Sequence, residues 1–385
     1  MTDIAGTVPV IAVDKVQAVA LAVCTYYFGV WLKGKVGVLS RYSIPSPVVG
    51  GMSFAIVVSF LEYFNIVKVQ IDSTLQTVLM LGFFTTIGLM ASLRVVKDGG
   101  RLLLGFLLAV TVLVFLQNGM GMAIAEAMGF DKHYGILAGS VSMMGGLGTA
   151  AAFGPYFEET YGITGGTAVA VTAATFGMVA ALLIGGPFGE WCIRRYKVKT
   201  PDEVQQPEPE LHLPDDMDTD ITEQHASAKP NFTNEIMRAV SVTALAMGLG
   251  TIVSNFLGHY ITLPAYIGAM IVATVIRNVG DFSGMYKVEG KGLNAVADIT
   301  LVLFVTMAIN NLKLHELVHL ALPLVVILAC QTILMLIYAW TVLFTAFGRS
   351  YDAVMLSVGG IGFSMGATAN GLANMQAISE KYGSP

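Results

Sequence analysis

Charged side chains are scarce in this chain of 385 residues: they make up 12% of it, against about 25% in soluble domains. Cysteine is also rare, and Cys24, Cys192 and Cys330 show no metal-binding or redox spacing, so we interpret them as packing residues. No Walker A motif occurs, which argues against a pump driven by ATP. Residues 1–14 lack the basic region and the small-residue cleavage site of a signal peptide.

Apolar residues dominate instead, at 55% of the chain, with a mean hydropathy of +0.70. Apolar runs long enough to cross a bilayer recur along most of the sequence. We therefore predict an all-α polytopic membrane protein with the lipid bilayer as its environment. In the first half, the predicted spans cover about residues 16–32, 47–66, 75–93, 102–128 and 165–191.

Two apolar stretches are interrupted by glycine and small polar residues. The first covers residues 140–153 and contains Gly145, Gly146 and Gly148; the second covers residues 357–371. Because glycine costs about 1 kcal/mol in a helix interior, an unbroken spanning helix is disfavoured at both places. Interrupted segments at corresponding positions in two halves indicate the binding site of a secondary transporter.

Lysine and arginine orient the spans, since cytoplasmic loops carry more of them. When the basic ends after the first and third spans are placed inside the cell, the N-terminus lies outside. The acidic loop at 158–161 then lies outside and the basic cluster at 194–199 inside, as the charge bias requires, only if the first glycine-rich stretch does not cross the membrane. It must enter and return to the same side. We therefore predict a re-entrant hairpin at about residues 136–153, where non-helical backbone must be buried in protein or line a water-filled cavity.

Residues 200–232 differ from the rest of the chain. They contain four prolines and nine acidic residues between positions 201 and 223, with no lysine or arginine before Lys229. This composition predicts a disordered cytoplasmic linker, with an acidic regulatory segment as the alternative.

The part of the chain after the linker repeats the part before it. Residues 263–270 resemble 44–52, residues 303–306 resemble 83–86, and residues 380–383 resemble 159–162. Five crossings in the first half make the second half start inside and run in the opposite direction. We therefore predict an N-terminal repeat (1–199) and an inverted C-terminal repeat (233–385) with a hairpin at about 352–371. The first repeat continues with a full span after its hairpin, whereas a tenth span is absent from this chain.

The ends of short helices inside such hairpins are suited to hold ions. An N-terminal end attracts a carboxylate, and exposed carbonyl groups suit Na⁺. We expect a small acidic substrate, Na⁺ as the only metal ion, no cofactor and no nucleic-acid partner. The predicted substrate-binding residues are Ser140, Ser142, Gly145, Gly146, Gly148, Thr149, Gly362, Ser364, Gly366, Thr368 and Asn370. The predicted cation-binding residues are Thr86, Gln117, Asn310, Thr368, Asn374 and Gln376.

Two catalytic patterns in the sequence suggest alternatives to a carrier. Residues 362–366 match Gly-x-Ser-x-Gly, but no strand precedes Ser364 and no histidine follows it, so chance is favoured over a hydrolase. His315 and His319 match His-Glu-x-x-His, the zinc motif of metalloproteases, but no third ligand lies nearby in the sequence. A membrane sensor or channel that uses the same pockets also stays open. The expected class is a transporter and not an enzyme.

The chain also resembles the bacterial sodium/glutamate symporter family over most of its length. The motifs that carry this resemblance are Tyr42-Ser43-Ile44-Pro45-x-Pro47-Val48-x-Gly50-Gly51, Phe83-Phe84-x-Thr86-Ile87-Gly88-Leu89, Gln117-Asn118, Gly145-Gly146-x-Gly148-Thr149, Ala174-Thr175-Phe176-Gly177, Gly185-Gly186-Pro187, Gly362-Phe363-x-x-Gly366-Ala367-Thr368 and Ala373-Asn374-Met375-Gln376-Ala377-Ile378. The resemblance implies two inverted five-span repeats, each with a re-entrant loop, and a homodimer. It also implies Na⁺-coupled import of an acidic amino acid across the inner membrane, with an elevator-like movement.

The sequence departs from the family pattern in both glycine-rich stretches. Leu147 stands where the pattern has histidine after the paired glycines, and residues 359–362 read Gly-Gly-Ile-Gly in place of Gly-His-Cys-Gly. Residues 367–370 read Ala-Thr-Ala-Asn in place of Ala-Thr-Pro-Thr. Another carboxylate or amino acid is therefore the alternative to glutamate as substrate.

Overall fold

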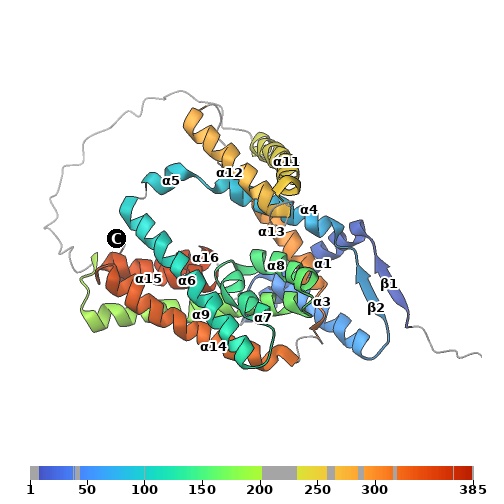
Figure 1. Ribbon diagram of the computed structural model, residues 1–385, viewed down its shortest axis with the longest axis horizontal. Helices are drawn as coiled ribbons and strands as arrows, with labels where there is room; N and C mark the ends of the chain where they lie inside the picture. The colour runs from blue at the N-terminus through green and yellow to red at the C-terminus, as the bar shows by residue number, and fades with distance from the viewer. Residues whose placement is uncertain are drawn as a thin grey trace, which may run out of the picture.

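The computed structural model describes residues 8–37, 39, 44–98, 100–201, 232–257, 265–284, 290–314, 319–366 and 368–383, and these are almost entirely helical (Figure 1). The first half contains α1 (Lys15–Lys35), α3 (Ser46–Tyr63), α4 (Thr74–Met90), α5 (Leu93–Asp98), α6 (Gly100–Ala127), α7 (Lys132–Ile136), the π-helix η1 (Leu137–Val141), α8 (Gly146–Tyr161) and α9 (Gly166–Tyr196). The second half contains α11 (Phe232–Leu257), α12 (Ala265–Ser283), α13 (Lys291–Asn310), α14 (Ala321–Tyr338), the π-helix η3 (Ala339–Ala346), α15 (Tyr351–Met365) and α16 (Thr368–Tyr382). Most of the predicted linker, residues 202–231, lies outside the described residues.

Helix length and composition confirm an all-α polytopic membrane protein. Among the described residues, seven helices are long and apolar enough to cross a bilayer, and α4 is a shorter apolar helix. A helix rises about 1.5 Å per residue, so about 20 residues cross the hydrocarbon layer. On α6, which has 28 residues, Leu104, Leu108 and Phe115 are exposed. Large apolar side chains on the outside of a long helix are what contact with lipid requires.

A short two-stranded sheet, which the sequence analysis did not predict, precedes the first helix. Strand β1 (Val10–Val13) pairs in parallel with β2 (Lys68–Ile71), with Val10 opposite Lys68. Asp14 then starts α1 through a capping box with Gln17. The sheet therefore holds the beginning of α1 next to the connection between α3 and α4.

The helices separate into two groups, and each group takes elements from both halves of the chain (Figure 1). The first helix group consists of α1, α3, α4, α11, α12 and α13; the second helix group consists of α6 to α9 and α14 to α16. Glycine permits close packing in the first group, where a Cβ added at Gly50 would lie 1.8 Å from the Thr25 carbonyl oxygen. In both halves, three helices enter the first group, and a long helix and a broken helix pair follow in the second.

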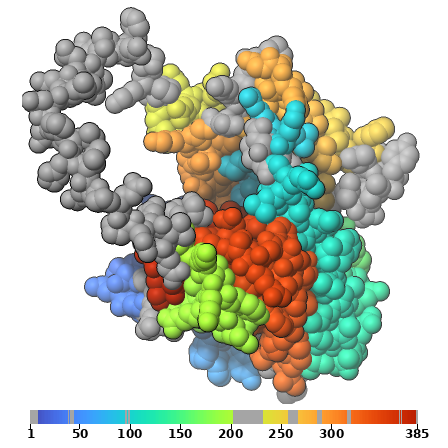
Figure 2. All heavy atoms as spheres, turned by 90° about the vertical axis from the view of Figure 1, so that its left-hand side faces the viewer, coloured from blue at the N-terminus to red at the C-terminus, as the bar shows by residue number. Residues whose placement is uncertain are grey.

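In the broken pair of the C-terminal half, the first arm is buried within the second helix group and the second arm is half exposed. On the face shown in Figure 2, the orange-red later part of the C-terminal half lies between the light green end of α9 and the teal α6. Nearly every residue of α15 is buried, including Val358, Ile361 and Met365. The two groups meet along α8, where a Cβ added at Gly148 would lie 2.8 Å from the Phe83 ring.

Candidate functional site

The first broken helix pair is hairpin 1, residues 132–161. Its first arm is α7 with η1, and its second arm is α8, which resumes after a turn at Met144 and Gly145. Gly146 has φ +71°, a conformation that side chains with a Cβ rarely adopt. At the other end of the arms, the His133 ring stacks on the Tyr161 ring with centroids 4.0 Å apart. The chain therefore ends this segment beside the place where it began.

The first arm of hairpin 1 is itself irregular. Gly139 has φ −90° and ψ −134°, which breaks the helix, and the side chain of Asn118 accepts a hydrogen bond from the Ser140 N–H at 3.0 Å. The Thr149 hydroxyl donates to the carbonyl oxygens of Val141 at 2.6 Å and Gly146 at 3.1 Å. Thr149 therefore ties the second arm to the first across the turn.

The second broken pair is hairpin 2, residues 351–383. Its arms are α15 and α16, separated at Gly366, which has φ −140° and ψ −90°. The Tyr351 hydroxyl donates to the Gly383 carbonyl oxygen at 2.6 Å, so the ends of this hairpin also lie together. A Cβ added at Gly362 would lie 2.4 Å from the backbone nitrogen of Gly371. Glycine is therefore required where the arms touch.

Two buried amides of α16 fix hairpin 2 to α9. The Asn370 amide donates to the Met178 carbonyl oxygen at 2.9 Å. The Asn374 amide donates to the carbonyl oxygens of Ala181 at 3.1 Å and Val358 at 3.3 Å. Since a buried amide must find partners, these bonds set the position of the second arm.

The turns of the two hairpins meet. A Cβ added at Gly146 of hairpin 1 would lie 2.9 Å from the Gly366 carbonyl oxygen of hairpin 2. Helix α9 passes both turns at Gly177, where an added Cβ would lie 2.0 Å from the Met365 carbonyl oxygen and 2.8 Å from the Met143 sulfur. The two glycine-rich stretches, more than 200 residues apart in the sequence, thus form one centre.

Three fully buried polar side chains adjoin this centre. The Gln117 amide donates to the Ser364 carbonyl oxygen at 3.1 Å, and the Gln331 amide donates to the Gln117 carbonyl oxygen at 2.7 Å. The side-chain oxygens of Gln117, Gln331 and Ser364 have no hydrogen-bond partner within the part of the chain that is described. Because a buried oxygen without a partner costs about 1–3 kcal/mol, these three require an explanation.

The structure brings together only part of the predicted site. The predicted residues that lie in the two hairpins are Ser140, Ser142, Gly145, Gly146, Gly148, Thr149, Gly362, Ser364, Gly366, Thr368, Asn370 and Asn374. Gln117 joins them from α6, whereas Thr86 and Asn310 belong to the first helix group. Asn310 donates there to the Thr25 hydroxyl at 3.1 Å. Gln376 is exposed and donates to Glu380 at 2.9 Å, away from the other members.

Gln331 was not in the predicted set. The available signal was its place as a lone amide in the long apolar run before hairpin 2, just as Gln117 lies in the long run before hairpin 1.

Neither catalytic pattern found in the sequence forms a described catalytic site. Ser364 stands in the last turn of α15, so a helix and not a strand precedes it. Of the His-Glu-x-x-His pattern, residues 315–318 lie outside the described residues. Within the described residues, no group of three or more histidine, cysteine or acidic side chains is placed to hold a metal ion.

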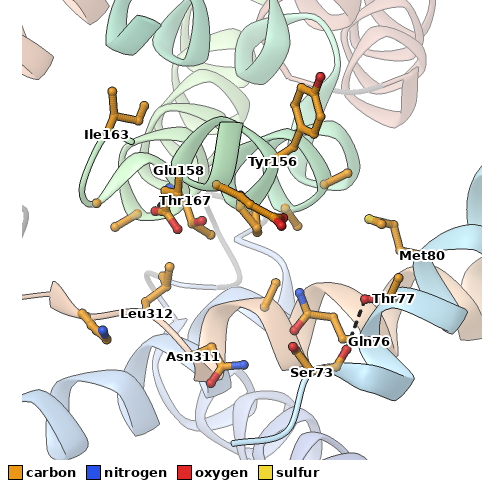
Figure 3. A pocket seen from close by; sticks show the side chains of 18 of the residues that line it. Ser73, Gln76, Thr77, Met80, Tyr156, Glu158, Ile163, Thr167, Asn311 and Leu312 are labelled. Atoms are coloured by element: carbon orange, nitrogen blue, oxygen red, sulfur yellow. Dashed lines mark hydrogen bonds between the residues drawn. The ribbon is translucent and has the colours of Figure 1, made fainter. Parts of the chain in front are cut away.

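A cavity lies between the helix groups, apart from the hairpin centre. It has a volume of about 580 Å³ and is walled by α8 and the start of α9 on one side and by α4, α12 and α13 on the other. Figure 3 shows Glu158 and Thr167 facing Ser73, Gln76 and Asn311 across it. We refer to it as the inter-group pocket.

Comparison with known proteins identifies the family of this chain. The family model for the sodium/glutamate symporter matches residues 11–384. A sodium/glutamate symporter of Escherichia coli K12 is 36% identical over 375 residues, which cover 96% of this chain and 90% of that protein. A sodium/glutamate symporter of Haemophilus influenzae is 33% identical, over 95% of this chain and 89% of that protein. The chain belongs to the sodium/glutamate symporter family.

Proposed function

We propose that this protein carries Na⁺ together with glutamate, or a similar small acidic substrate, across the bacterial inner membrane. The observation that carries the proposal is the meeting of two hairpin turns beside buried, unpartnered oxygens. Its curated relatives bear the name sodium/glutamate symporter, which supports both the substrate and the coupling ion. Na⁺ acts as the coupling ion, and no further cofactor is needed.

The hairpin turns supply charge of both signs without a charged side chain. Helix α8 begins at Gly146 and α16 begins at Thr368, so two helix N-termini point at the centre and attract a carboxylate. Helix α15 ends there at Met365, and a helix C-terminus favours a cation. The exposed Thr368 hydroxyl at the start of α16 is available as a further ligand of the substrate.

The cation is held by neutral oxygens. The side-chain oxygens of Gln117, Gln331 and Ser364 are buried and lack partners in the described structure. Ser364 stands in the last turn of α15, the Gln117 amide donates to its carbonyl oxygen, and the Gln331 amide donates to the backbone carbonyl oxygen of Gln117. Carbonyl and hydroxyl oxygens of this kind suit Na⁺. The proposal thus replaces the scattered predicted set with one compact cation site.

Both hairpins enter the bilayer without crossing it, from opposite sides. Glu159, in the last turn of α8, and Lys313, just after α13, line the same inter-group pocket, and the charge rule assigns both to the outside. On the proposed inner side, Arg195 and Arg349 lie over the Tyr196 ring at 6.0 Å and 5.5 Å. Each cluster joins segments that lie far apart in the chain. The N-terminus is then outside and the acidic linker cytoplasmic.

Transport follows from movement of the second helix group against the first. Both hairpins and the proposed cation site lie in the second group, so a rigid shift of this group carries the substrate with it. The first group stays in place and forms the contacts of a homodimer. This arrangement is an elevator-like form of alternating access.

The decisive experiment is uptake of labelled glutamate into proteoliposomes with and without a Na⁺ gradient. We expect uptake only with the gradient, and Gln117→Ala should raise the Na⁺ concentration for half-maximal uptake about tenfold, equivalent to about 1.4 kcal/mol. Thr111→Ala, at an exposed threonine on the same helix, is the matched control and should behave like the wild type. Absence of uptake in both conditions would contradict glutamate as substrate, and uptake indifferent to Na⁺ would contradict the coupling.

Competition by other acids tests the alternative substrates. A Cβ added at Gly360, where the family pattern has histidine, would lie 2.5 Å from a methyl carbon of Leu343, so η3 already fills that space. If aspartate or a dicarboxylate competes better than glutamate, the substrate assignment changes while the cation site stands. Ion current without accumulation of any of these acids would favour a channel.

A further inference from the structure

The inter-group pocket contains polar groups that the hairpin centre does not use. Gln76, Thr167 and Tyr266 are buried, with 8%, 8% and 3% of their surface exposed. An oxygen of each side chain is unpartnered, so far as the described residues extend. They come from three helices, α4, α9 and α12, and all three line the pocket. Three buried oxygens without partners thus belong to residues that line one cavity, where a polar ligand can complete their hydrogen bonds.

Charged groups at the mouth of the pocket have both signs. Glu159 and Lys313 are exposed lining residues, and Glu158 is half-buried between them and the floor. The Glu158 carboxylate accepts a hydrogen bond from the Thr167 N–H at 2.7 Å, at the N-terminus of α9. A carboxylate of the protein itself therefore already occupies one helix N-terminus here. The N-terminus of α4 is adjacent, and the Ser73 side chain makes no capping bond to it.

We infer that the inter-group pocket is a second, outer binding site for the free acidic amino acid, occupied before it reaches the hairpin turns. The hydroxyl groups of Thr167 and Tyr266, with Lys313, donate to the carboxylates of the ligand. The Glu159 carboxylate receives the ammonium group. This inference rests on the proposed function and names an additional site for its substrate.

The size and position of the pocket agree with this role. Its volume of about 580 Å³ lies within the range of about 300–1,000 Å³ usual for small-molecule sites. Ala151 and Ala152, one turn beyond Thr149 of the hairpin centre, form part of its wall. One side belongs to the first helix group and the other to the second, so any relative movement of the groups changes the site (Figure 3).

The test is protection of a cysteine in the pocket from a membrane-impermeant maleimide. Asn311→Cys is made in the full-length protein with Cys24, Cys192 and Cys330 replaced by alanine. Lys68→Cys, exposed on β2 and not a lining residue, is the control position. We expect glutamate without Na⁺ to slow labelling of Asn311→Cys at least threefold and to leave Lys68→Cys unchanged.

Side-chain variants separate this site from the hairpin centre. Tyr266→Phe keeps the ring stacked on Phe84, at 4.5 Å between centroids, and removes only the hydroxyl group. Together with Thr167→Val it should abolish the protection and raise the KM for glutamate uptake about three- to tenfold with Vmax unchanged. Glu159→Gln should remove the preference for glutamate over glutarate, which lacks the ammonium group, in the protection assay.

The outcomes distinguish the two proposals. Protection that requires Na⁺ and disappears in Gln117→Ala would overturn the outer site, because the ligand would then be bound at the hairpin turns. Unchanged protection and KM in the Tyr266→Phe, Thr167→Val variant would overturn it as well. If the wild-type protein accumulates no acid with a Na⁺ gradient yet shows the protection, the proposed function fails and the outer site stands.

Discussion

The two hairpins share a design but differ in what holds them. Hairpin 1 is a part of the second helix group that packs against the first; it borders the inter-group pocket and has a first arm broken at Gly139. Hairpin 2 has a regular, buried first arm and a half-exposed second arm, which two asparagine amides fix to α9. With equal glycine content, one hairpin therefore borders both helix groups, and the other, so far as the described residues show, packs within the second group. Hairpin 1 is therefore the hairpin that both lines the inter-group pocket and contacts the first helix group.

The substitution with the largest expected effect acts on both hairpins at once. In Gly177→Ala, the new methyl group would lie 2.0 Å from the Met365 carbonyl oxygen and 2.8 Å from the Met143 sulfur, so both turns must move away from α9. We expect uptake to fall more than tenfold, since overpacking costs about 1–3 kcal/mol. Gly186→Ala on the same helix meets no atom within 4 Å and is the control. Normal uptake by Gly177→Ala would show that the turns do not need to meet.

A smaller effect should separate the anchoring of hairpin 2 from ion binding. Asn374→Ala removes two bonds to carbonyl oxygens and should lower the thermal midpoint of unfolding in detergent by a few degrees, equivalent to about 1–2 kcal/mol. Gln376→Ala, two positions along on the exposed side, should change neither this midpoint nor the Na⁺ dependence of uptake. A Gln376→Ala variant with a raised Na⁺ requirement would restore the predicted cation set.

The smallest effect concerns the open end of hairpin 1. The backbone N–H of His133 bonds the Asp131 carboxylate and holds the pKa of that group below its usual value. A lowered carboxyl pKa adds stability that is present above the ordinary pKa, about 3.9, and is lost as pH falls through the lowered value. Asp131→Asn should therefore lose less stability than the wild type between pH 5 and pH 3, by under about 1 kcal/mol because the site is exposed. Identical acid-unfolding curves for the wild type and Asp131→Asn would show that the ionised Asp131 carboxylate does not stabilise the protein.

Hydropathy predicted the long helices closely because it measures the property that bilayers select. The fourth predicted span, 102–128, corresponds to α6 at Gly100–Ala127. Hairpin 1 extends further than the predicted range of 136–153, since α8 continues through Glu158 to Tyr161. Acidic residues lower the hydropathy of a segment, so the predicted apolar stretch stops before the helix does. The sequence analysis did not predict the β1–β2 pair, because each strand has only four residues.

Side-chain partners were harder to predict than spans. Asn310 and Gln117 are both lone amides in apolar runs, yet they lie in different helix groups. Sequence shows which residues are polar within a span, but not which helices face each other. Glycine was more informative. At Gly146, Gly177 and Gly362, another part of the backbone comes so close that any side chain would block the contact.

The β1–β2 pairing has a consequence for how the protein is made. Its strands are parallel, so α1 and α3 form the crossover between them, and the closed unit uses only residues up to Ile71. This unit can be completed while α4 and everything after it are still being synthesised. The first two membrane helices would then be fastened to each other outside the bilayer before any hairpin exists, which gives later helices a finished surface to pack on.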